Sequence, residues 1–258
     1  MSLVVLLFII GFIGSFISGM VGIGGAIINY PMILYIPALL GFAGYTSHEV
    51  SGITAVQVFF ATFAGAWVYR KSNDMDKTLV VYMGASILIG SFIGSFIGSF
   101  SANLLNEHAV NVVYTVLATI AAMMMFVPKK NNSGAVNYNK WLASVLAFIV
   151  GGVSGIIGAG GAFLLVPIML VILKLPLRMT IATSIAITFI SSVGITTGKV
   201  ITGQVVVIPA LIIAVASIFA APLGVRVGKR INQKVLQYML SILIVGTAVK
   251  MWIDMISK

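Results

Sequence analysis

Apolar residues fill long stretches of this chain, and short polar or glycine-containing breaks separate them. A helix that crosses a membrane needs about 20 mostly apolar residues. The first stretch is apolar from Leu3 and lacks a basic start or an evident cleavage site, so we expect a retained helix rather than a signal peptide. The pattern predicts ten helical segments, near residues 3–20, 26–42, 50–69, 79–100, 109–127, 141–157, 162–174, 179–198, 205–222 and 235–254.

Two of the breaks consist of only a few glycine-rich residues. They join the first segment to the second, and the sixth segment to the seventh. Some of the segments are short for a straight crossing of a bilayer. Each glycine-linked pair is therefore either a full helical hairpin or a re-entrant pair that turns back within the membrane, and the pattern leaves both forms open.

The composition fits a membrane protein and narrows the chemistry. Of the 258 residues, 60% are hydrophobic and 8% are charged, whereas soluble domains carry about 25% charged residues. Most of the protein surface must then face something other than water. The chain has no cysteine and two histidines, and it carries no zinc-binding, paired-carboxylate or complete phosphate-loop motif. We therefore expect a protein that is not an enzyme and that uses no cofactor or metal.

The net charge of +10 comes from basic residues in short loops, which indicates membrane orientation rather than a nucleic-acid partner. If the chain reverses at every break, twelve lysines and arginines lie on one side and three on the other. Basic residues favour the cytoplasmic side of a membrane. We therefore predict a multi-pass protein of the cytoplasmic membrane with both termini outside. Re-entrant pairs give the same result, because each returns to its starting side.

The sequence contains an internal repeat. Residues 18–34 read SGMVGIGGAIINYPMIL and residues 154–170 read SGIIGAGGAFLLVPIML, with eight of 17 positions identical. Each half holds five segments, an odd number, so the second half must enter the membrane upside down relative to the first. We therefore predict an all-α polytopic membrane protein with two inverted-topology repeats, a plan typical of secondary transporters. The repeats span 1–128 and 141–258, and a polar cytoplasmic linker spans 129–140.

The two glycine clusters are the strongest candidates for a binding site. Three glycines within four residues should interrupt a helix, because glycine tolerates left-handed backbone and weakens helices. Non-helical backbone at membrane depth persists only where protein buries it or where it lines a wet cavity. A helix that restarts after such a break offers free N–H groups to an anion. A tight turn between packed helices is the other interpretation. The candidates are Gly22, Gly24, Gly25, Ala26, Gly158, Gly160, Gly161 and Ala162.

A few neutral polar residues inside the apolar segments could complete this site. Hydroxyl and amide groups bind an oxyanion without the cost of burying a charge. The alternative is that they form hydrogen bonds between helices or with the preceding turn of their own helix. The candidates are Asn29, Thr54, Gln57, Thr183 and Ser184.

Two further features have open interpretations. Small residues recur every four positions in GSFIGSFIGSFSA, residues 90–102, and again from Ala216 to Gly228. This spacing lets helices approach closely, either between the two halves or across a homodimer. Lys199 is the lone basic residue of an outward loop in the second half. It either attracts anions or extends its ammonium group to the membrane surface.

At these residues the sequence resembles the TauE/SafE family of membrane transporters, which is associated with the export of sulfite and organosulfonates. GIGGAIINYPMIL (22–34) and GAGGAFLLVPIML (158–170) carry the resemblance, together with the segments around Thr54 and Thr183. The family pattern favours a third glycine where this chain has Ala26 and Ala162. The resemblance implies that a small sulfur-containing oxyanion moves outward across the cytoplasmic membrane. Our mechanistic hypothesis is alternating access, in which the two inverted halves rock around a site near the midplane.

Other functions remain open at this stage. A carrier of another small anion or of an amino acid would share the same fold. A channel or a membrane scaffold would lack alternating access. The expected partners are a small anionic substrate and the lipid bilayer.

Overall fold

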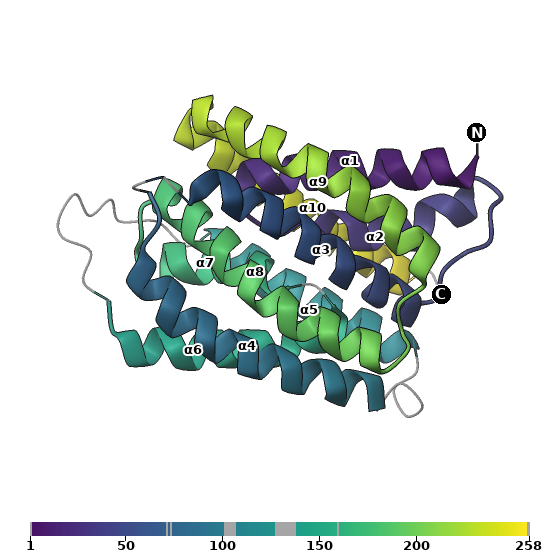
Figure 1. Cartoon of the computed structure of the whole chain (residues 1–258), viewed down its shortest axis with the longest axis horizontal. Coiled ribbons are helices and arrows are strands. Elements are labelled where there is room, and N and C mark those ends of the chain that lie inside the picture. Colours follow the sequence, from purple (N-terminus) through teal and green to yellow (C-terminus); the bar gives the residue numbers. More distant parts are fainter. Residues whose placement is uncertain are drawn as a thin grey trace.

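The fold is a bundle of helices that run roughly along one axis, with both chain termini at the same end (Figure 1). The computed structural model describes residues 2–70, 72, 74–100, 107–126, 138–158 and 160–256. The helices are α1 (Leu3–Val21), α2 (Ala26–Leu39), α3 (Ser47–Tyr69), α4 (Lys77–Phe100), α5 (Glu107–Phe126), α6 (Lys140–Ile157), α7 (Ala162–Val171), α8 (Leu177–Ile201), α9 (Val207–Arg230) and α10 (Gln233–Ile256).

These helices confirm the ten segments that the apolar pattern predicts. Local signals explain several of the starts. Thr46 and Glu49 form a capping box at the start of α3. Asn139 caps the start of α6, where its side chain accepts from the N–H groups of Trp141 and Leu142. The predicted linker at 129–140 lies mostly outside the described residues.

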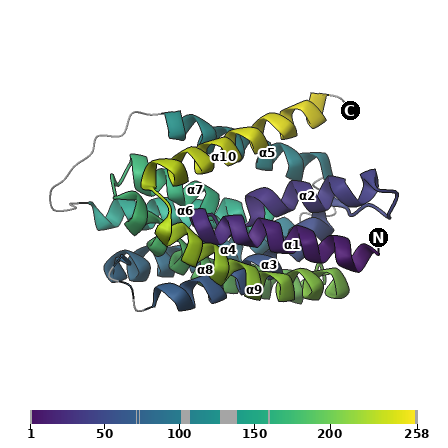
Figure 2. The same cartoon turned by 90° about the horizontal axis from the view of Figure 1, so that it is seen from above.

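Seven of the described helices are long and apolar enough to cross a membrane, and α2 and α7 are not among them. Their 14 and 10 residues extend about 21 and 15 Å, against a hydrocarbon core of about 30 Å. Each runs back toward the end of the bundle from which the preceding helix came (Figure 2). The short lengths of α2 and α7 favour the re-entrant form of the glycine-linked pairs, and the set of long apolar helices shows a multi-pass membrane protein.

The main helix contacts join one half of the chain to the other. Helix α1 packs against α9, and α4 packs against α6. Helix α3 packs against α8 and α9, α8 against α4, and α5 against α10. If α1–α5 are matched in order with α6–α10, the α1–α9 contact corresponds to α6–α4, and the α3–α9 contact corresponds to α8–α4. The α3–α8 and α5–α10 contacts correspond to themselves. The inverted insertion of the two repeats in a membrane stays a prediction.

The runs of small residues form these close contacts between the halves. A Cβ atom added at Gly94 would clash with the backbone of Gly152 in α6, and one at Gly98 would lie 2.8 Å from Ile156 Cα. In the second run, a Cβ atom at Gly228 would lie 2.7 Å from Met20 O in α1. Both runs therefore pack the two halves together, which is one of the two interpretations left open by the sequence.

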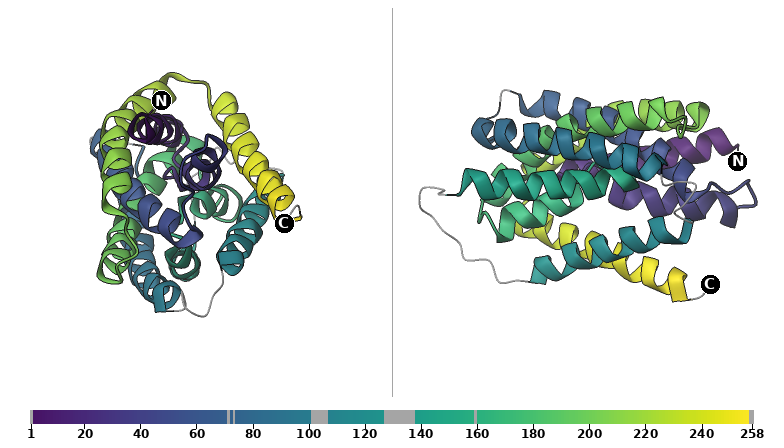
Figure 3. Two further views of the ribbon diagram at one scale, coloured as in Figure 1. Left: turned by 90° about the vertical axis from the view of Figure 1, so that its right-hand side faces the viewer. Right: turned by 90° about the horizontal axis from the view of Figure 1, so that it is seen from below.

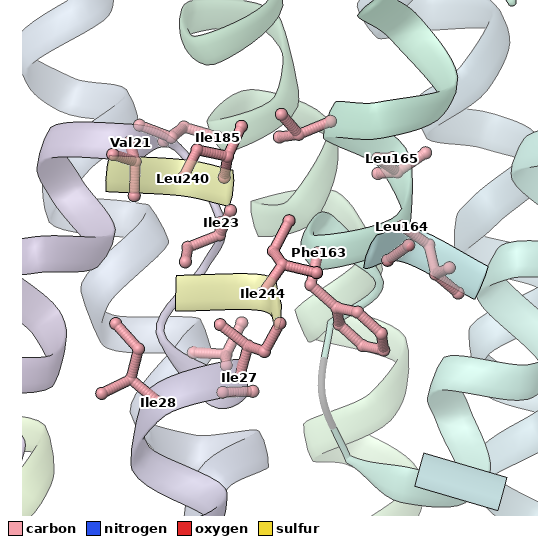
Figure 4. Packing of buried hydrophobic residues seen from close by; sticks show 14 of the residues in the cluster. Val21, Ile23, Ile27, Ile28, Phe163, Leu164, Leu165, Ile185, Leu240 and Ile244 are labelled. Carbon is pink, nitrogen blue, oxygen red and sulfur yellow. The ribbon is translucent and has the colours of Figure 1, made fainter. Parts of the chain in front are cut away.

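The interior of the bundle is apolar around the glycine breaks. An end-on view places α2 and α7 inside the longer helices (Figure 3), and every residue of α7 from Ala162 to Leu170 is buried. Near the first break, Ile23 and Ile27 pack with Phe163 of α7 and Ile244 of α10 (Figure 4). The protein partners of any buried polar side chain in this region are therefore informative.

Candidate functional site

The two glycine clusters adopt the left-handed backbone that their composition predicts. Gly22, Gly24 and Gly25 have φ angles of 79°, 75° and 88°. The second cluster repeats this geometry, with 78°, 70° and 76° at Gly158, Gly160 and Gly161. A side chain is strained in this region of backbone space. The triple glycine is therefore what allows α1 to end and α2 to start within a few residues, and likewise α6 and α7.

The two breaks meet at the middle of the bundle. A Cβ atom at Gly24 would lie 3.1 Å from Thr188 Cγ2 and 3.2 Å from the Cβ of Ala162, the first residue of α7. A Cβ atom at Gly160 would lie 2.6 Å from Val58 Cγ1 and 2.9 Å from Thr188 Cγ2. Val58 and Thr188 lie near the midpoints of α3 and α8. We call this meeting point of the two breaks with α3 and α8 the junction.

Gln57 brings a polar group to the junction from α3. A Cβ atom at Gly25 would clash with the Gln57 amide, so this amide lies directly against the start of α2. Gln57 Nε2 donates to Ser15 Oγ at 2.9 Å, and Ser15 Oγ lies 2.7 Å from Ser217 Oγ of α9. Gln57 Oε1 is buried and has no hydrogen-bond partner. Gln57 Nε2 is thus held by serines, and Gln57 Oε1 is free to accept a hydrogen bond from a ligand.

Asn29 lies in the first turn of α2, and its amide is also unsatisfied. Both Asn29 Oδ1 and Nδ2 are buried without a hydrogen-bond partner. The side chain rests against α1, where a Cβ atom on Gly14 would clash with it. Burying an unpaired polar group costs about 1–3 kcal/mol. The fold therefore retains Asn29 at a cost to stability, which is common for groups that bind a ligand.

From α8, Thr188 contributes a hydroxyl to the junction. Its methyl group lies against both glycine breaks, and its Oγ1 is buried without a partner. A threonine in a helix usually donates to a carbonyl of its own preceding turn. Thr62 of α3 does so, with Thr62 Oγ1 2.6 Å from Val58 O. The Thr188 hydroxyl is therefore available for a ligand, whereas the Thr62 hydroxyl is not.

The structure places the other predicted polar residues in different roles. Thr54 Oγ1 donates to Val50 O at 2.7 Å, within its own helix. Thr183 Oγ1 accepts from the N–H of Asp76 at 3.0 Å, next to the start of α4. Ser184 Oγ donates to Gly22 O at 2.9 Å and so holds the first break in position. Of the predicted hydroxyls, Ser184 contacts a glycine break directly, while Thr54 and Thr183 are bonded elsewhere.

Helices α2 and α7 both begin at the junction with an alanine. Ala26 and Ala162 are fully buried first residues of these helices. Behind Ala26, the N–H groups of Ile28 and Asn29 donate to Gly25 O. The first N–H groups of any helix lack a partner within that helix. The starts of two helices thus direct partial positive charge into the same region.

A small charged cavity lies beside the first glycine break, at the end of the bundle opposite the termini. It has a volume of about 20 Å³. Met20 and Ile181 line it, and a Cβ atom at Gly22 would lie 2.9 Å from Ile181 Cα. Arg178 and Lys229 also line it, together with Asp74 and Tyr69. Two cations therefore lie near the first glycine break.

At the same end, Asp76 connects three segments. Its Oδ2 accepts from the Tyr138 hydroxyl at 2.7 Å, its Oδ1 accepts from the N–H of Leu79 at 3.1 Å, and its own N–H donates to Thr183. Partial burial, followed by this hydrogen bond and the negative charge of Asp76, raises the pKa of Tyr138. These contacts tie α4, α8 and the start of α6 together.

Sequence reasoning selected Gly24, Gly160 and Gln57, which lie at the junction, and Asn29, whose amide lies against α1. It did not select Thr188, Ser15 or Ser217. The signal for Ser15 was a serine in an apolar helix one turn before Ser18. That signal is weak, because its partners Gln57 and Ser217 are far away in the sequence and only the fold brings them together.

Comparisons with known proteins agree with this architecture. The chain is 24% identical to the probable membrane transporter protein YunE of Bacillus subtilis, over 93% of this chain and 94% of that protein. It is 24% identical to the probable membrane transporter protein MJ0441 of Methanocaldococcus jannaschii, over 92% of this chain and 90% of that protein. No solved structure matches the chain at a significant level.

The family comparison covers nearly the whole chain. The model of the sulfite exporter TauE/SafE family matches residues 7–251, which include both glycine breaks and all the helices that form the junction. These relatives are transporters, in agreement with the expectation that the chain is not an enzyme. The chain therefore belongs to the TauE/SafE sulfite exporter family of membrane transporters.

Proposed function

We propose that this protein is a secondary transporter that exports a small sulfur-containing oxyanion, such as sulfite or an organosulfonate, and binds it at the junction. The observation that carries the proposal is the set of unsatisfied polar groups there. The amide of Asn29, Gln57 Oε1 and Thr188 Oγ1 are all buried without partners. They stand beside two helix starts, and this combination favours a compact anion.

The chemistry of these groups fits a partly protonated oxyanion. Asn29 Nδ2 and the Thr188 hydroxyl donate hydrogen bonds to anionic oxygens, and Gln57 Oε1 accepts one from a ligand O–H. Neutral donors bind an anion without the large cost of a buried unpaired charge. The sulfur-containing cargo itself comes from the name of the family, whose members are described as sulfite exporters.

Alternating access would use the duplicated architecture. In inverted-repeat transporters, the two halves rock around a site near the midplane. Here the breaks from both halves meet between α3 and α8. Opening toward the termini would separate the contacts around Gly158, and opening toward the other end would separate those around Gly22 and Asp76. Because the small-residue contacts α1–α9 and α4–α6 join the two halves closely, α1 together with α9 and α4 together with α6 would form the moving units.

We further propose the cytoplasmic membrane as the location, with both termini outside. Arg178, Lys229, Lys140 and Lys234 belong to the helix ends opposite the termini, and a basic end favours the cytoplasm. The partners would be the small anion and the lipid bilayer, without nucleic acid. A homodimer would have to use a face other than the small-residue runs, because those runs are occupied within the chain.

The test is transport into proteoliposomes that carry the purified protein. Labelled sulfite, taurine, sulfoacetate, sulfate and acetate are supplied separately, with and without a proton gradient. Saturable uptake of sulfite or a sulfonate, but not of acetate, supports the proposal. Uptake of acetate alone would indicate a carrier of another anion. Non-saturable flux would indicate a channel, and no flux from folded protein would indicate a scaffold.

A pair of matched variants connects transport to the junction. Thr188→Val keeps the shape of the side chain and removes the free hydroxyl, and we expect transport to fall about tenfold, the effect of one hydrogen bond to a charged ligand. Thr62→Val is the control, because that hydroxyl already bonds to its own helix. Equal activity of the two variants would place the substrate elsewhere.

A further inference from the structure

Lys199 is buried in the last turn of α8, at the end of the bundle that holds the termini (Figure 1). It is 0% exposed. Its ammonium group donates to Gln204 Oε1 at 2.7 Å and to Ile156 O at 3.3 Å. Both acceptors are neutral, and among the described side chains none forms an ion pair with Lys199. The position thus holds a positive charge that no described residue neutralises.

This arrangement differs from the usual behaviour of a lysine near the end of a membrane helix. Such a lysine normally extends to the interface and keeps its charge in water. A cation that stays buried is normally paired with an anion. Lys199 does neither, so an anion from outside the chain is the partner that its surroundings lack.

The neighbours of Lys199 supply further groups for such an anion. Ser51 Oγ of α3 is 0% exposed and has no hydrogen-bond partner. A Cβ atom at Gly158 would lie 2.7 Å from Ser51 Oγ, and Gly158 follows two residues after Ile156, which holds the ammonium group. On the other side, Gly52 packs against the backbone of Gln204. Ser51 and Lys199 are therefore held by the same two segments.

This cluster is separate from the junction. Lys199 follows Thr188 by eleven residues in α8, about three turns and 16 Å along the helix. Three turns return to nearly the same face, so both residues point from α8 toward the breaks. The cluster thus lies between the junction and the end of the protein that holds the termini.

We propose that Lys199, Ser51 and the backbone beside Gly158 form a second anion-binding station between the junction and the outer surface. An arriving oxyanion would take the place of the Gln204 amide oxygen at the ammonium group and accept a hydrogen bond from Ser51. The chemistry requires only a small oxyanion. The identification of this anion as the transported substrate rests on the proposed function.

Charge-selective labelling tests the station directly. The chain contains no cysteine, so Ser51→Cys creates a single thiol beside Lys199 without other changes. Its labelling rate is measured in intact cells with two methanethiosulfonate reagents of similar size, one carrying a sulfonate and one a quaternary ammonium group. Ser2→Cys, at an exposed position, supplies the reference rates at the outer surface.

We expect the anionic reagent to label Ser51→Cys about tenfold faster than the cationic one, after division by the Ser2→Cys rates, because a nearby cation attracts it in a medium of low dielectric constant. Adding Lys199→Gln should abolish this preference, and Lys199→Arg should retain it. Lys199→Met serves as a second neutral variant if the glutamine variant is not recovered. Sulfate, an oxyanion that does not react with thiosulfonates, should slow the labelling only when position 199 is basic.

Two results would overturn the station. One is an equal preference for the anionic reagent with and without the positive charge. The other is no labelling of Ser51→Cys by either reagent while Ser2→Cys is labelled. Failure of the proposed function gives a different result, in which charge-selective labelling persists but no anion is transported into proteoliposomes.

Discussion

Replacing single glycines by alanine should separate the strain of the left-handed backbone from the packing of the junction. Gly246 has open space around its Cβ position and needs no positive φ, so Gly246→Ala should be neutral or stabilising by up to about 1 kcal/mol. Gly203 has a φ of +71° and open space. Gly203→Ala should therefore show the strain alone, about 1–2 kcal/mol of destabilisation.

Gly160→Ala should be the most destabilising member of this series. It combines a φ of +70° with contacts of 2.6 Å to Val58 and 2.9 Å to Thr188. Forcing extra atoms into a packed interior adds about 1–3 kcal/mol to the strain, which gives a total of about 2–5 kcal/mol. Gly24→Ala should lie between Gly203→Ala and Gly160→Ala, since its closest contact is 3.1 Å.

The assay is the apparent melting temperature of detergent-purified protein, followed by size-exclusion chromatography after heating. Thr188→Ser removes the methyl group that an alanine at position 160 would meet, and it keeps the hydroxyl. The double variant should therefore recover part of the stability that Gly160→Ala loses. Equal melting temperatures for Gly160→Ala and Gly203→Ala would refute the conclusion that the breaks meet in a packed junction.

Individual hydrogen bonds lead to three further predictions. Thr54→Val should keep sulfite transport within about twofold of the wild type, because Thr54 bonds within its own helix. A loss of transport comparable to that of Thr188→Val would show that Thr54 belongs to the binding site. Asn29→Leu should raise the melting temperature, since it removes a buried unpaired amide, and lower sulfite transport; a gain in stability without loss of transport would leave Asn29 without a binding role. The pKa of Tyr138 is raised in the folded protein, so its contribution to stability is present below its unfolded pKa of about 10 and lost as the pH rises through the folded value. The difference in melting temperature between wild type and Tyr138→Phe should therefore shrink in alkaline buffer. A difference that stays constant would show that the bond to Asp76 does not contribute.

The sequence predicted the helices and their glycine breaks better than it predicted the polar contacts. The breaks at Gly22 and Gly158 could be predicted because clustered glycines both weaken a helix and permit left-handed backbone. The sequence could not show whether Thr54 or Thr188 has a free hydroxyl, because every threonine in a helix can bond to the preceding turn. Only the packing of the breaks against α8 distinguishes the free hydroxyl from the satisfied one.

The small-residue runs show the same difference. Their spacing predicted close helix contacts, but it left open whether the partner was the other half or a second copy. That choice depends on how α4 and α9 are placed relative to α6 and α1, which is a property of the whole fold. Gly94 against Gly152 is a contact between the halves that neither local pattern specifies.

The two halves contribute unequally to the junction, and exchanging one pair of residues can test this. Asn29 corresponds to Leu165 in the repeat. Gly14 makes room for the Asn29 amide, and its counterpart in α6 is Val150, which already lies against the second break at Gly161. An amide at position 165 would therefore meet a valine side chain where Asn29 meets a glycine.

The double variant Asn29→Leu with Leu165→Asn should consequently fail to restore sulfite transport, and its melting temperature should fall below that of Asn29→Leu, because it buries an amide at an apolar position where it has no hydrogen-bond partner. If the double variant transported sulfite like the wild type, the amide would act from either half, and the symmetry of the repeat, rather than the contact of Asn29 with α1, would determine where the anion binds.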